Sequence, residues 1–362
     1  MRIDQAIGSS AKWPHLQEGE MQARLLRRVI SLVSVLSLVM GSGAAQSFNF
    51  ESIDVPCSSC NGGIALATTA YGINPAGDIV GTYNDKAGQH GFLRKDGQFT
   101  TIDVPASLVG GSPGIALPTV ARGISPDGDI VGSFTAPVNP LPADPLWYCP
   151  QATSTYCIKG FLYQRGKFSL VLFPGQLGTI AQRITPTGSI YGCMHGADMM
   201  GSMYGFGMMR SGDTSLQADG GELADPTRSL PASMENGATP DGRIRVGLYA
   251  SDFMDPTKVF AHGYVVEDGI LKTYDFPGPS GPFQTNINDI NPEGDFVGIY
   301  IGIGGHRHGF LQIADGSAPI TLDYPAAIHT RAFGINPSQT IVGQFIDSNG
   351  AHGFVARPAA NN

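Results

Sequence analysis

The sequence predicts an all-β protein: a six-bladed β-propeller of four-stranded antiparallel blades, with the last blade closed by the N-terminal strand. Three observations support this expectation. The stretch Tyr71–Pro105 recurs in altered form along the chain, its first turn occurs six times, and the sixth copy lacks a last strand that a segment near the N-terminus matches. Repeats of roughly 40–50 residues with four strands each are typical of propeller blades.

Each copy is interpreted as four strands, lettered A to D, joined by two tight turns and a polar loop. Pro75 suits the φ of a type I turn and Gly77 suits a following residue with positive φ, so a hairpin joins A to B. Asp96-Gly97 is a strong two-residue hairpin signal between C and D. In the first copy the expected strands are Ala70–Asn74, Asp78–Tyr83, His90–Lys95 and Gln98–Val104.

The copies are counted by the A–B turn motif, which is Ile-Asn-Pro in the first copy and a variant of it in most others. Neighbouring motifs lie 45 to 60 residues apart. The motif begins at Ile73, Ile124, Ile184, Ala238, Ile290 and Ile335.

The sixth copy ends with Gly353–Pro358, before any D strand. Phe48–Pro56 (FNFESIDVP) matches the D strand of the first copy (FTTIDVP). We therefore expect Phe48–Pro56 to pair with the last strand of the chain, because this closure removes the edge that an open array of sheets would expose.

Residues that face each other across a two-residue hairpin have numbers with a constant sum, so each C–D turn predicts its cross-strand partners. Directly opposed side chains share one face, with Cβ atoms about 4.5–5.5 Å apart. In the second copy Lys159 faces Leu172, so both partners are replaced together. We interpret these contacts as structural pairs that hold the hairpins, rather than as metal ligands. The predicted pairs are His90–Asp103, His262–Asp275, His308–Asp323 and, through ring closure, His352–Asp54.

The repeated motifs resemble those of the HAF family, bacterial extracellular repeat proteins named for a short His-aromatic repeat motif. The matching residues are GINPAGDIVG at Gly72–Gly81 and HGFL at His90–Leu93, and the resemblance covers about Phe48–Pro358. The third copy departs from the pattern, with Tyr204 in place of His. The resemblance implies secretion and a repeat fold, and it implies no activity.

Residues 1–45 are interpreted as a secretory signal peptide, with Met21 as an alternative start. Arg24, Arg27 and Arg28 precede the apolar core Val29–Met40, which is short for a membrane span, and small residues follow it. A membrane anchor is the alternative. We expect residues 46–358 to form a single propeller, residues 359–362 to be a tail, and the protein to be secreted or periplasmic in a bacterium.

Composition and charge restrict the classes of partner that the protein is expected to bind. The 49 Gly and 26 Pro among 362 residues suit many tight turns between strands. Loss of residues 1–45 removes five basic and three acidic residues from totals of 22 and 30, so the mature chain carries a net charge of −10. An acidic chain without a basic cluster argues against nucleic acid or an anionic membrane as partner. We expect a monomer with an unknown extracellular ligand and no cofactor.

Five cysteines remain after cleavage, and in an oxidising compartment pairing is the rule. Cys149 and Cys157 lie in one insertion and are expected to form a disulfide. Cys57 and Cys60 form a CxxC without a thioredoxin-like context, so a local disulfide or two thiols is expected. Cys193 stands near His195 and several methionines, a set that suits Cu(I). Methionine also fills irregular cores, which is the interpretation we favour, and no metal site is predicted.

The expected binding face follows from the connections. Their length varies in the D–A and B–C segments, which antiparallel alternation places on one face, and loops on a rigid scaffold commonly bind ligands. The insertion Ala136–Ile158 is a candidate recognition loop or, alternatively, a Pro-rich cover over the ring mouth; its aromatic residues are Trp147, Tyr148 and Tyr156. We expect a non-catalytic scaffold that binds a glycan, peptide or small ligand on this face.

The alternative is a hydrolase or lyase that acts on a carbohydrate through polar residues near the ring axis. The axial candidates, of which Arg122, Glu235, Asn288 and Arg331 are also candidates for ligand binding, are Tyr71, Arg122, Gln182, Glu235, Asn236, Asn288, Asp289 and Arg331. The sequence shows no pair of carboxylates at a known spacing, and no G-x-S-x-G, HExxH or P-loop motif. We therefore predict no catalytic residue, and the simplest interpretation is that these side chains line a hydrated channel.

Overall fold

The computed structural model describes residues 46–137, 156–172, 178–195, 203–210, 233–251, 260–278 and 283–360. From Ser47 onward these residues belong to one compact unit, and the unit is all-β, as the sequence predicts. Its helical pieces within the described ranges are two short 3₁₀ segments, η1 (Asn61–Gly63) and η2 (Ala106–Val109). None of the described residues forms a helix with the length and apolarity needed to cross a membrane.

The described strands form five sheets, and when they are grouped by copy of the sequence motif they give six sets, which we call repeats one to six. Repeat one contains β2 (Ala67–Ile73), β3 (Ile79–Asn84), β4 (Gln89–Lys95) and β5 (Gln98–Thr101). Repeat two contains β6 (Thr119–Ile124), β7 (Ile130–Pro137), β8 (Tyr156–Gln164) and β9 (Lys167–Val171). Repeat three contains β10 (Gly178–Ile184), β11 (Ser189–His195) and β12 (Met203–Arg210). Repeat four contains β13 (Met234–Ala238), β14 (Ile244–Ser251), β15 (Phe260–Glu267) and β16 (Ile270–Tyr274). Repeat five contains β17 (Gln284–Ile290), β18 (Phe296–Ile301), β19 (Arg307–Gln312) and β20 (Ile320–Leu322). Repeat six contains β21 (His329–Ile335), β22 (Ile341–Asp347), β23 (Gly350–Pro358) and the N-terminal β1 (Phe48–Ile53).

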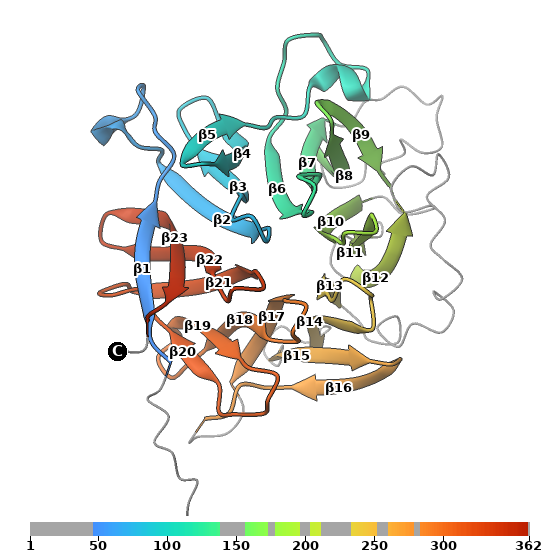
Figure 1. Ribbon diagram of the computed structural model, residues 1–362. Helices are drawn as coiled ribbons and strands as arrows, with labels where there is room; N and C mark the ends of the chain where they lie inside the picture. Colours follow the sequence, from blue (N-terminus) through green and yellow to red (C-terminus); the bar gives the residue numbers. More distant parts are fainter. Residues whose placement is uncertain are drawn as a thin grey trace, which may run out of the picture. The chain divides into compact units, whose positions relative to one another are not determined.

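The arrangement of these repeats is propeller-like. Figure 1 shows them following one another around a common centre, with the A strands β2, β6, β10, β13, β17 and β21 innermost. Repeats two to five each form a separate sheet. Repeats six and one share an eight-stranded sheet, because a parallel bridge between Ala67 and Ala351 joins β2 to β23. This link between β2 and β23 differs from the separate blades that the sequence predicts.

The two ends of the described chain meet in one sheet. β1 pairs antiparallel with β23 in a register that sets Phe48 opposite Pro358 and Ser52 opposite Phe354. The backbone N–H of Ala359 donates to the carbonyl of Ser47 at 2.8 Å. The expected pairing between the N-terminal strand and the last strand is therefore confirmed.

The first repeat also shows where the expected strand limits shift. β2 begins at Ala67 rather than Ala70, because Thr68 and Thr69 already pair with β3. β5 ends at Thr101 rather than Val104. Val104 instead accepts a backbone hydrogen bond from Leu117 and donates its N–H to the Thr119 hydroxyl, so the end of strand D turns toward repeat two.

The core lies between neighbouring sheets and depends on one recurring aromatic residue of strand C. Phe92 is fully buried, and a Cβ on Gly81 of strand B would lie 2.6 Å from its ring. Glycine is therefore required at that point, because a Cβ would collide with the backbone carbonyl oxygen of Thr69 as well as with the ring. The same aromatic position is filled by Phe161, Tyr264, Phe310 and Phe354, all fully buried.

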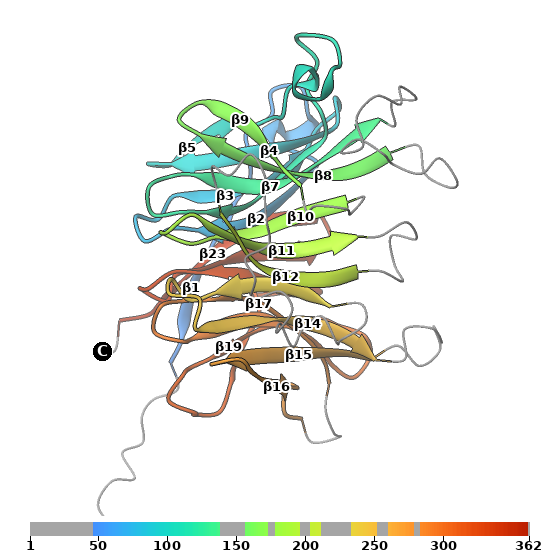
Figure 2. The same cartoon turned by 90° about the vertical axis from the view of Figure 1, so that its right-hand side faces the viewer.

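The A–B and C–D turns share one face of the molecule, as the sequence predicts for the described connections. In repeat one the Lys95 ammonium of the C–D hairpin lies 3.3 Å from the Asp78 carboxylate beside the A–B turn. In repeat five the Ala314 N–H donates to Asp295 in the same way. Figure 2 shows successive sheets side by side, with their strands running from this face to the other. The D–A and B–C connections accordingly belong to the opposite face.

Candidate functional site

The four predicted His–Asp pairs are present, each with its histidine on a C strand and its aspartate within two residues after the end of the paired strand. The distances from His Nδ1 to the nearest carboxylate oxygen are 2.7 Å for His90–Asp103, 3.0 Å for His262–Asp275, 2.9 Å for His308–Asp323 and 3.0 Å for His352–Asp54. Each imidazole also stacks on an aromatic ring of strand B, such as Tyr83 under His90 at 5.0 Å. Within the described ranges no three His, Cys, Asp or Glu side chains gather as a metal site.

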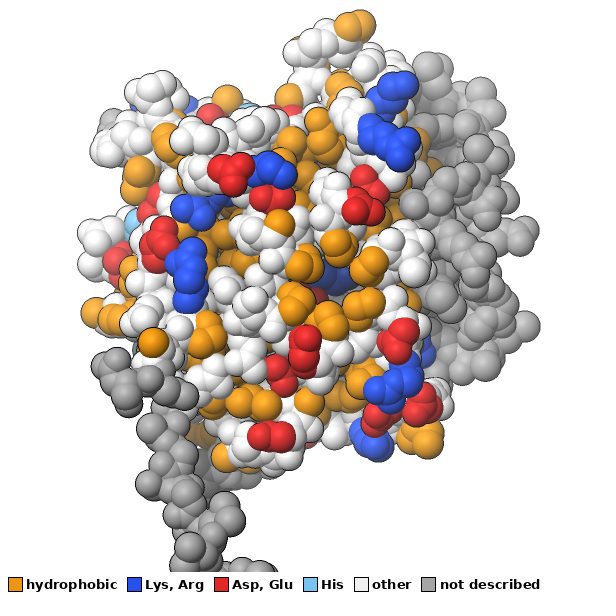
Figure 3. Space-filling view, viewed as in Figure 1, with side chains coloured by type: hydrophobic (Ala, Val, Ile, Leu, Met, Phe, Trp, Pro, Cys, Tyr) orange, Lys and Arg blue, Asp and Glu red, His pale blue; other side chains and the backbone are white. Residues whose placement is uncertain are grey.

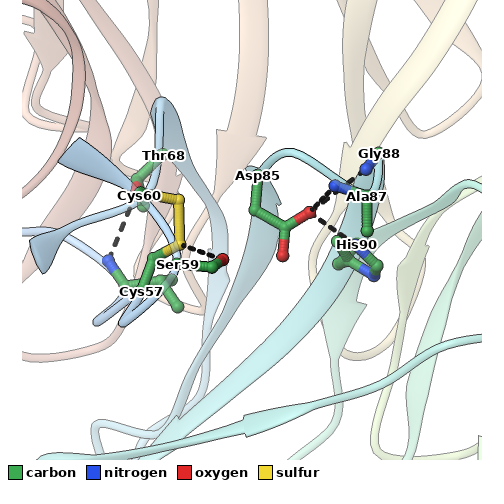
Figure 4. Close-up of a disulfide and its surroundings, with 9 residues drawn as sticks. Cys57, Ser59, Cys60, Thr68, Asp85, Ala87, Gly88 and His90 are labelled. Carbon is green, nitrogen blue, oxygen red and sulfur yellow. Dashed lines mark hydrogen bonds and ion pairs between the residues drawn. A yellow bond between two sulfur atoms is a disulfide. The ribbon is translucent and has the colours of Figure 1, made fainter.

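His90 shows the electrostatics of these pairs. Burial opposes a charge on its ring, but the carboxylates of Asp103 and Asp85 outweigh burial and raise the pKa of His90 above 6.5. Figure 4 shows Asp85 accepting from the His90 ring and from the N–H groups of Ala87 and Gly88. In repeat two Lys159 holds the equivalent place, where burial lowers the pKa of its ammonium.

Cys57 and Cys60 form a disulfide in the connection between β1 and β2, visible in Figure 4. The Cys57 N–H donates to the carbonyl of Gly63 at 2.9 Å, which closes the small loop. Of the two outcomes left open by the sequence, the local disulfide is the one found. Cys193 lies fully buried in β11, and burial raises the pKa of its thiol to about 12.

The axis of the unit is built by a β-bulge in every A strand. Each strand has one unpaired residue just before its A–B turn, and a bulge re-aims the backbone that follows. The unpaired residues are Tyr71, Arg122, Gln182, Asn236, Asn288 and Phe333. The next residue is Gly72, Gly123, Arg183, Gly237, Asp289 and Gly334 in the six repeats. Four repeats thus carry glycine at the axis and two carry opposite charges.

Arg183 spans the axis from repeat three. Its Nη2 donates to the carbonyls of Tyr71 at 3.1 Å, Asn288 at 3.3 Å and Phe333 at 2.5 Å. Its Nη1 donates to the carbonyls of Arg122 at 2.9 Å and Gln182 at 2.8 Å. The carbonyls are those of the bulged residues, so one guanidinium satisfies five of these six inward groups.

Asp289 of repeat five completes the axial contact. One carboxylate oxygen lies 2.9 Å from Arg183 Nε, and the other accepts the N–H of Ile335 from repeat six at 3.1 Å. Burial raises the pKa of Asp289, and the Arg183 charge opposes that rise. The pair therefore joins repeats three, five and six by charge and hydrogen bonds together.

The four glycines leave the room that this pair occupies. A Cβ on Gly123 would lie 2.8 Å from the Arg183 Cα, and a Cβ on Gly237 would lie 3.0 Å from the Asp289 Cα. A Cβ on Gly72 would lie 2.6 Å from the carbonyl oxygen of Arg122. At the position after the bulge, side chains are therefore excluded except for the two charged ones.

The predicted ligand residues Arg122 and Asn288 lie in the ring of bulged residues and are engaged there. The Arg122 guanidinium lies over the Tyr71 ring at 5.1 Å, and its Nη1 donates to the Gln182 side chain at 3.3 Å. Asn288 Nδ2 donates to the carbonyl of Ala332 at 2.7 Å. These side chains tie neighbouring repeats together.

Glu235 does not lie among the axial groups where the sequence analysis placed it. It takes the core-facing position that is alanine or isoleucine in the other repeats, is fully buried, and lies 2.9 Å from Arg245. Burial, and then the Glu235 charge, raise the pKa of Tyr191 to about 12. The bulge in β13 explains the difference, because the inserted Asn236 turns toward the axis in its place.

Arg331 belongs to a basic cluster on the D–A/B–C face, with Arg307, His306 and His329. Arg331 donates to the Gln344 side chain at 3.1 Å, and burial together with the Arg307 charge lowers its pKa. The backbone N–H of Arg307 donates to His329 Nδ1 at 3.2 Å, and the rings of His306 and His329 lie 5.6 Å apart. Neither arginine has an ion pair with a described carboxylate. The sequence analysis found no such cluster, because 22 residues separate the contacting groups.

The remaining predicted residues are not placed in the site. Trp147, Tyr148 and Cys149 lie outside the described residues, and so does the expected partner contact of Cys157. Tyr156 and Cys157 begin β8. The recognition loop and the second disulfide therefore stay predictions.

An axial pocket opens on the face of the A–B turns. Its volume is ≈ 130 Å³, and every repeat contributes to it through its turn proline and the residue two places before. Figure 3 shows apolar side chains gathered around a basic one at the centre of this face. Arg183 and Asp289 lie at its base, whereas Glu235 is not part of it.

No protein-family model matches the chain, and no curated protein matches it. Solved structures with a similar backbone include a sialidase of Trypanosoma rangeli in complex with 2,3-difluorosialic acid, as a covalent intermediate. The identity is 9%, the TM-score is 0.46, and the match covers 86% of this chain and 58% of that one. The chain thus spans less than two thirds of the length of that sialidase.

Proposed function

We propose that the protein is a secreted six-bladed β-propeller that binds an acidic ligand, such as an acidic glycan, without catalysis on its D–A/B–C face. The observation that carries the proposal is the basic cluster of Arg307, Arg331, His306 and His329. Arginine matches carboxylate and sulfate groups because its planar N–H groups donate to two oxygens at once. Two arginines without an ion pair to any carboxylate of the described residues are unusual in a chain whose net charge is −8.

Exposed apolar side chains support the choice of face. Large hydrophobic residues rarely stand exposed without a reason when they gather at one place. Ile303 is 73% exposed and Ile328 is 48% exposed, and both lie in the connections that carry the basic cluster. Ile64, Leu66 and Ile115 are exposed in other D–A connections. A ligand with an anionic group and an apolar ring face, as a sugar acid has, matches both features.

The six-bladed count and the secreted location are parts of the same proposal. Six repeats around one axis, with β1 and β23 in one sheet, support the first. The Cys57–Cys60 disulfide supports the second, because such bonds persist in oxidising compartments. The enzymatic alternative is less well supported, since the axial Asp289 and the buried Glu235 are both engaged with arginine.

The test is a binding screen of the protein without residues 1–45 against acidic and neutral glycans, with two variants and a control. Arg307→Gln and Arg331→Gln should each weaken binding of an acidic glycan about tenfold or more, because each removes a charge-assisted contact. Arg243→Gln, on the face of the turns, should leave binding unchanged and serves as the matched control. Equal binding by all variants, or a preference for neutral glycans, would refute the proposal.

The pH dependence of ligand binding gives an independent check of the proposal. Burial and the neighbouring positive charges lower the pKa of His329, so its ring is neutral at pH 7. A bound anion favours the charged ring, and binding should therefore tighten as the pH falls from about 7.5 to about 5.5. A His329→Gln variant should lose that dependence, which isothermal titration calorimetry at both pH values measures.

A further inference from the structure

We propose that the axial pocket on the face of the A–B turns binds one neutral aromatic ring, stacked on the guanidinium of Arg183. The pocket volume of ≈ 130 Å³ is close to the about 150 Å³ of an apolar protein cavity that holds benzene. The pocket therefore accommodates a single six-membered ring. It lies on the face opposite the basic cluster, so this inference stands without the proposed function.

The orientation of the guanidinium follows from its hydrogen bonds. The N–H groups of arginine lie in the guanidinium plane. Those of Arg183 reach carbonyls of Tyr71, Arg122 and Phe333, which belong to repeats one, two and six around the axis. The plane therefore lies across the axis, and one of its faces looks into the pocket. Arginine planes attract the faces of aromatic rings by cation–π contact and stacking.

The same contacts of Arg183 argue against an anion as the ligand of the axial pocket. Both terminal nitrogens of Arg183 already donate to backbone carbonyls, and its Nε lies 2.9 Å from the Asp289 carboxylate. An anion would find no terminal N–H group without a partner, and the nearby carboxylate would repel it. The rim is apolar, with the turn prolines standing exposed or half-exposed around the opening. The rim prolines are Pro75, Pro126, Pro186, Pro240, Pro292 and Pro337.

Substitution of Ala238 gives a variant that tests the pocket and should still fold. The other five repeats carry isoleucine at this position, and all six residues line the pocket. Ala238→Ile gives repeat four the residue of its neighbours and narrows the pocket on one side. Ile270→Ser, at an exposed position on β16, is the control for a general change in the protein.

The experiment titrates the wild-type protein with p-cresol, N-acetyltyrosinamide, cyclohexylmethanol and inorganic phosphate, observed by NMR. We expect saturable binding of p-cresol, binding about fivefold weaker for cyclohexylmethanol because it lacks a π face, and none for phosphate. Ala238→Ile should weaken p-cresol binding about fivefold, and Ile270→Ser should not. If N-acetyltyrosinamide binds at least as well as p-cresol, the natural ring is a side chain of a polypeptide; if only p-cresol binds, it is a small molecule.

Three results would overturn the inference. They are competition between phosphate and p-cresol for the same resonances, equal binding of p-cresol and cyclohexylmethanol, and p-cresol binding that Ala238→Ile leaves unchanged. Absence of p-cresol binding up to its solubility limit would overturn it as well.

Discussion

The outer part of the protein, which carries the His–Asp pairs of strands C and D and is called the rim below, and the axis of the protein both use aspartate to bind a basic side chain. They do so in different ways. At the rim, each His–Asp contact joins two paired strands of one repeat, three of them across a hairpin and the fourth between β23 and the N-terminal β1. At the axis, a single Arg183–Asp289 contact joins several repeats, and its two residues stand where the other repeats carry glycine. Contacts that stabilise one repeat recur with the repeat, whereas the contact that holds the repeats together depends on two departures from it.

The largest effect should come from the axis. Asp289→Ala leaves the Arg183 charge buried without its carboxylate, which we expect to lower the free energy of unfolding by about 3–5 kcal/mol. Chemical denaturation measures the change. The double variant Arg183→Gly/Asp289→Gly gives both repeats the residue of the other four and should be less destabilised than Asp289→Ala alone. A loss below about 1 kcal/mol for Asp289→Ala would contradict a structural role for the pair.

Substitution of an aspartate at the rim should lower the free energy of unfolding by a smaller amount, which increases with the burial of that aspartate. Asp103 accepts from the His90 ring and from the Gly91 N–H, and its side chain is 13% exposed, so Asp103→Ala should cost about 1–2 kcal/mol. The Asp323 side chain is 47% exposed, so Asp323→Ala should cost about 0.5 kcal/mol. Equal losses for the two variants would show that burial does not set the strength of these pairs.

The rim should also respond to pH. The pKa of His90 is raised above 6.5 in the folded state, so the pair adds stability that is fully present below about pH 6.5 and is lost as the pH rises through the folded value. A His90→Gln variant should therefore be destabilised more at about pH 5.5 than at about pH 8.5, by less than about 1 kcal/mol. An NMR titration that places the folded pKa of His90 below 6.5 would contradict this expectation.

The smallest effect should come from an ion pair of similar length on the surface. Arg243 Nη1 lies 2.9 Å from the Glu267 carboxylate, the same distance as in the axial pair, but both side chains are well exposed. Arg243→Ala should leave the denaturation midpoint unchanged, because solvent screens exposed charges. A shift as large as that of Asp103→Ala would mean that contact distance, rather than burial, decides the effect.

This contrast explains how much was predictable from the sequence. The all-β fold, the pairing of β1 with β23 and the His–Asp contacts follow from repeat spacing and hairpin register, because both are local rules applied several times. Arg183 was missed although a signal was present: alignment of the six A–B turns shows glycine before the motif in four copies, and arginine and aspartate in the other two. Glu235 was predicted at the axis and does not lie there, because a bulge in β13 shifts which residue faces the axis. No residue type in the sequence indicates that bulge.

The basic cluster and the axial pocket were beyond that reasoning for a related cause. Arg307 and Arg331 come from adjacent repeats, and the pocket needs one turn from each of six. Such juxtapositions depend on the angle between neighbouring sheets, which side-chain packing sets and which single-repeat patterns do not encode.

The hydrogen bond between Ser47 and Ala359 has a consequence for how the chain reaches this state. β1 precedes all six repeats in the sequence and its partner β23 belongs to the sixth, so the sheet that contains both cannot assemble until the repeats between them have been made. Contacts of such long sequence separation slow folding. A circular permutant that joins these two ends with a short linker and opens the chain between two other repeats should fold faster than the natural order, while it keeps the same set of contacts.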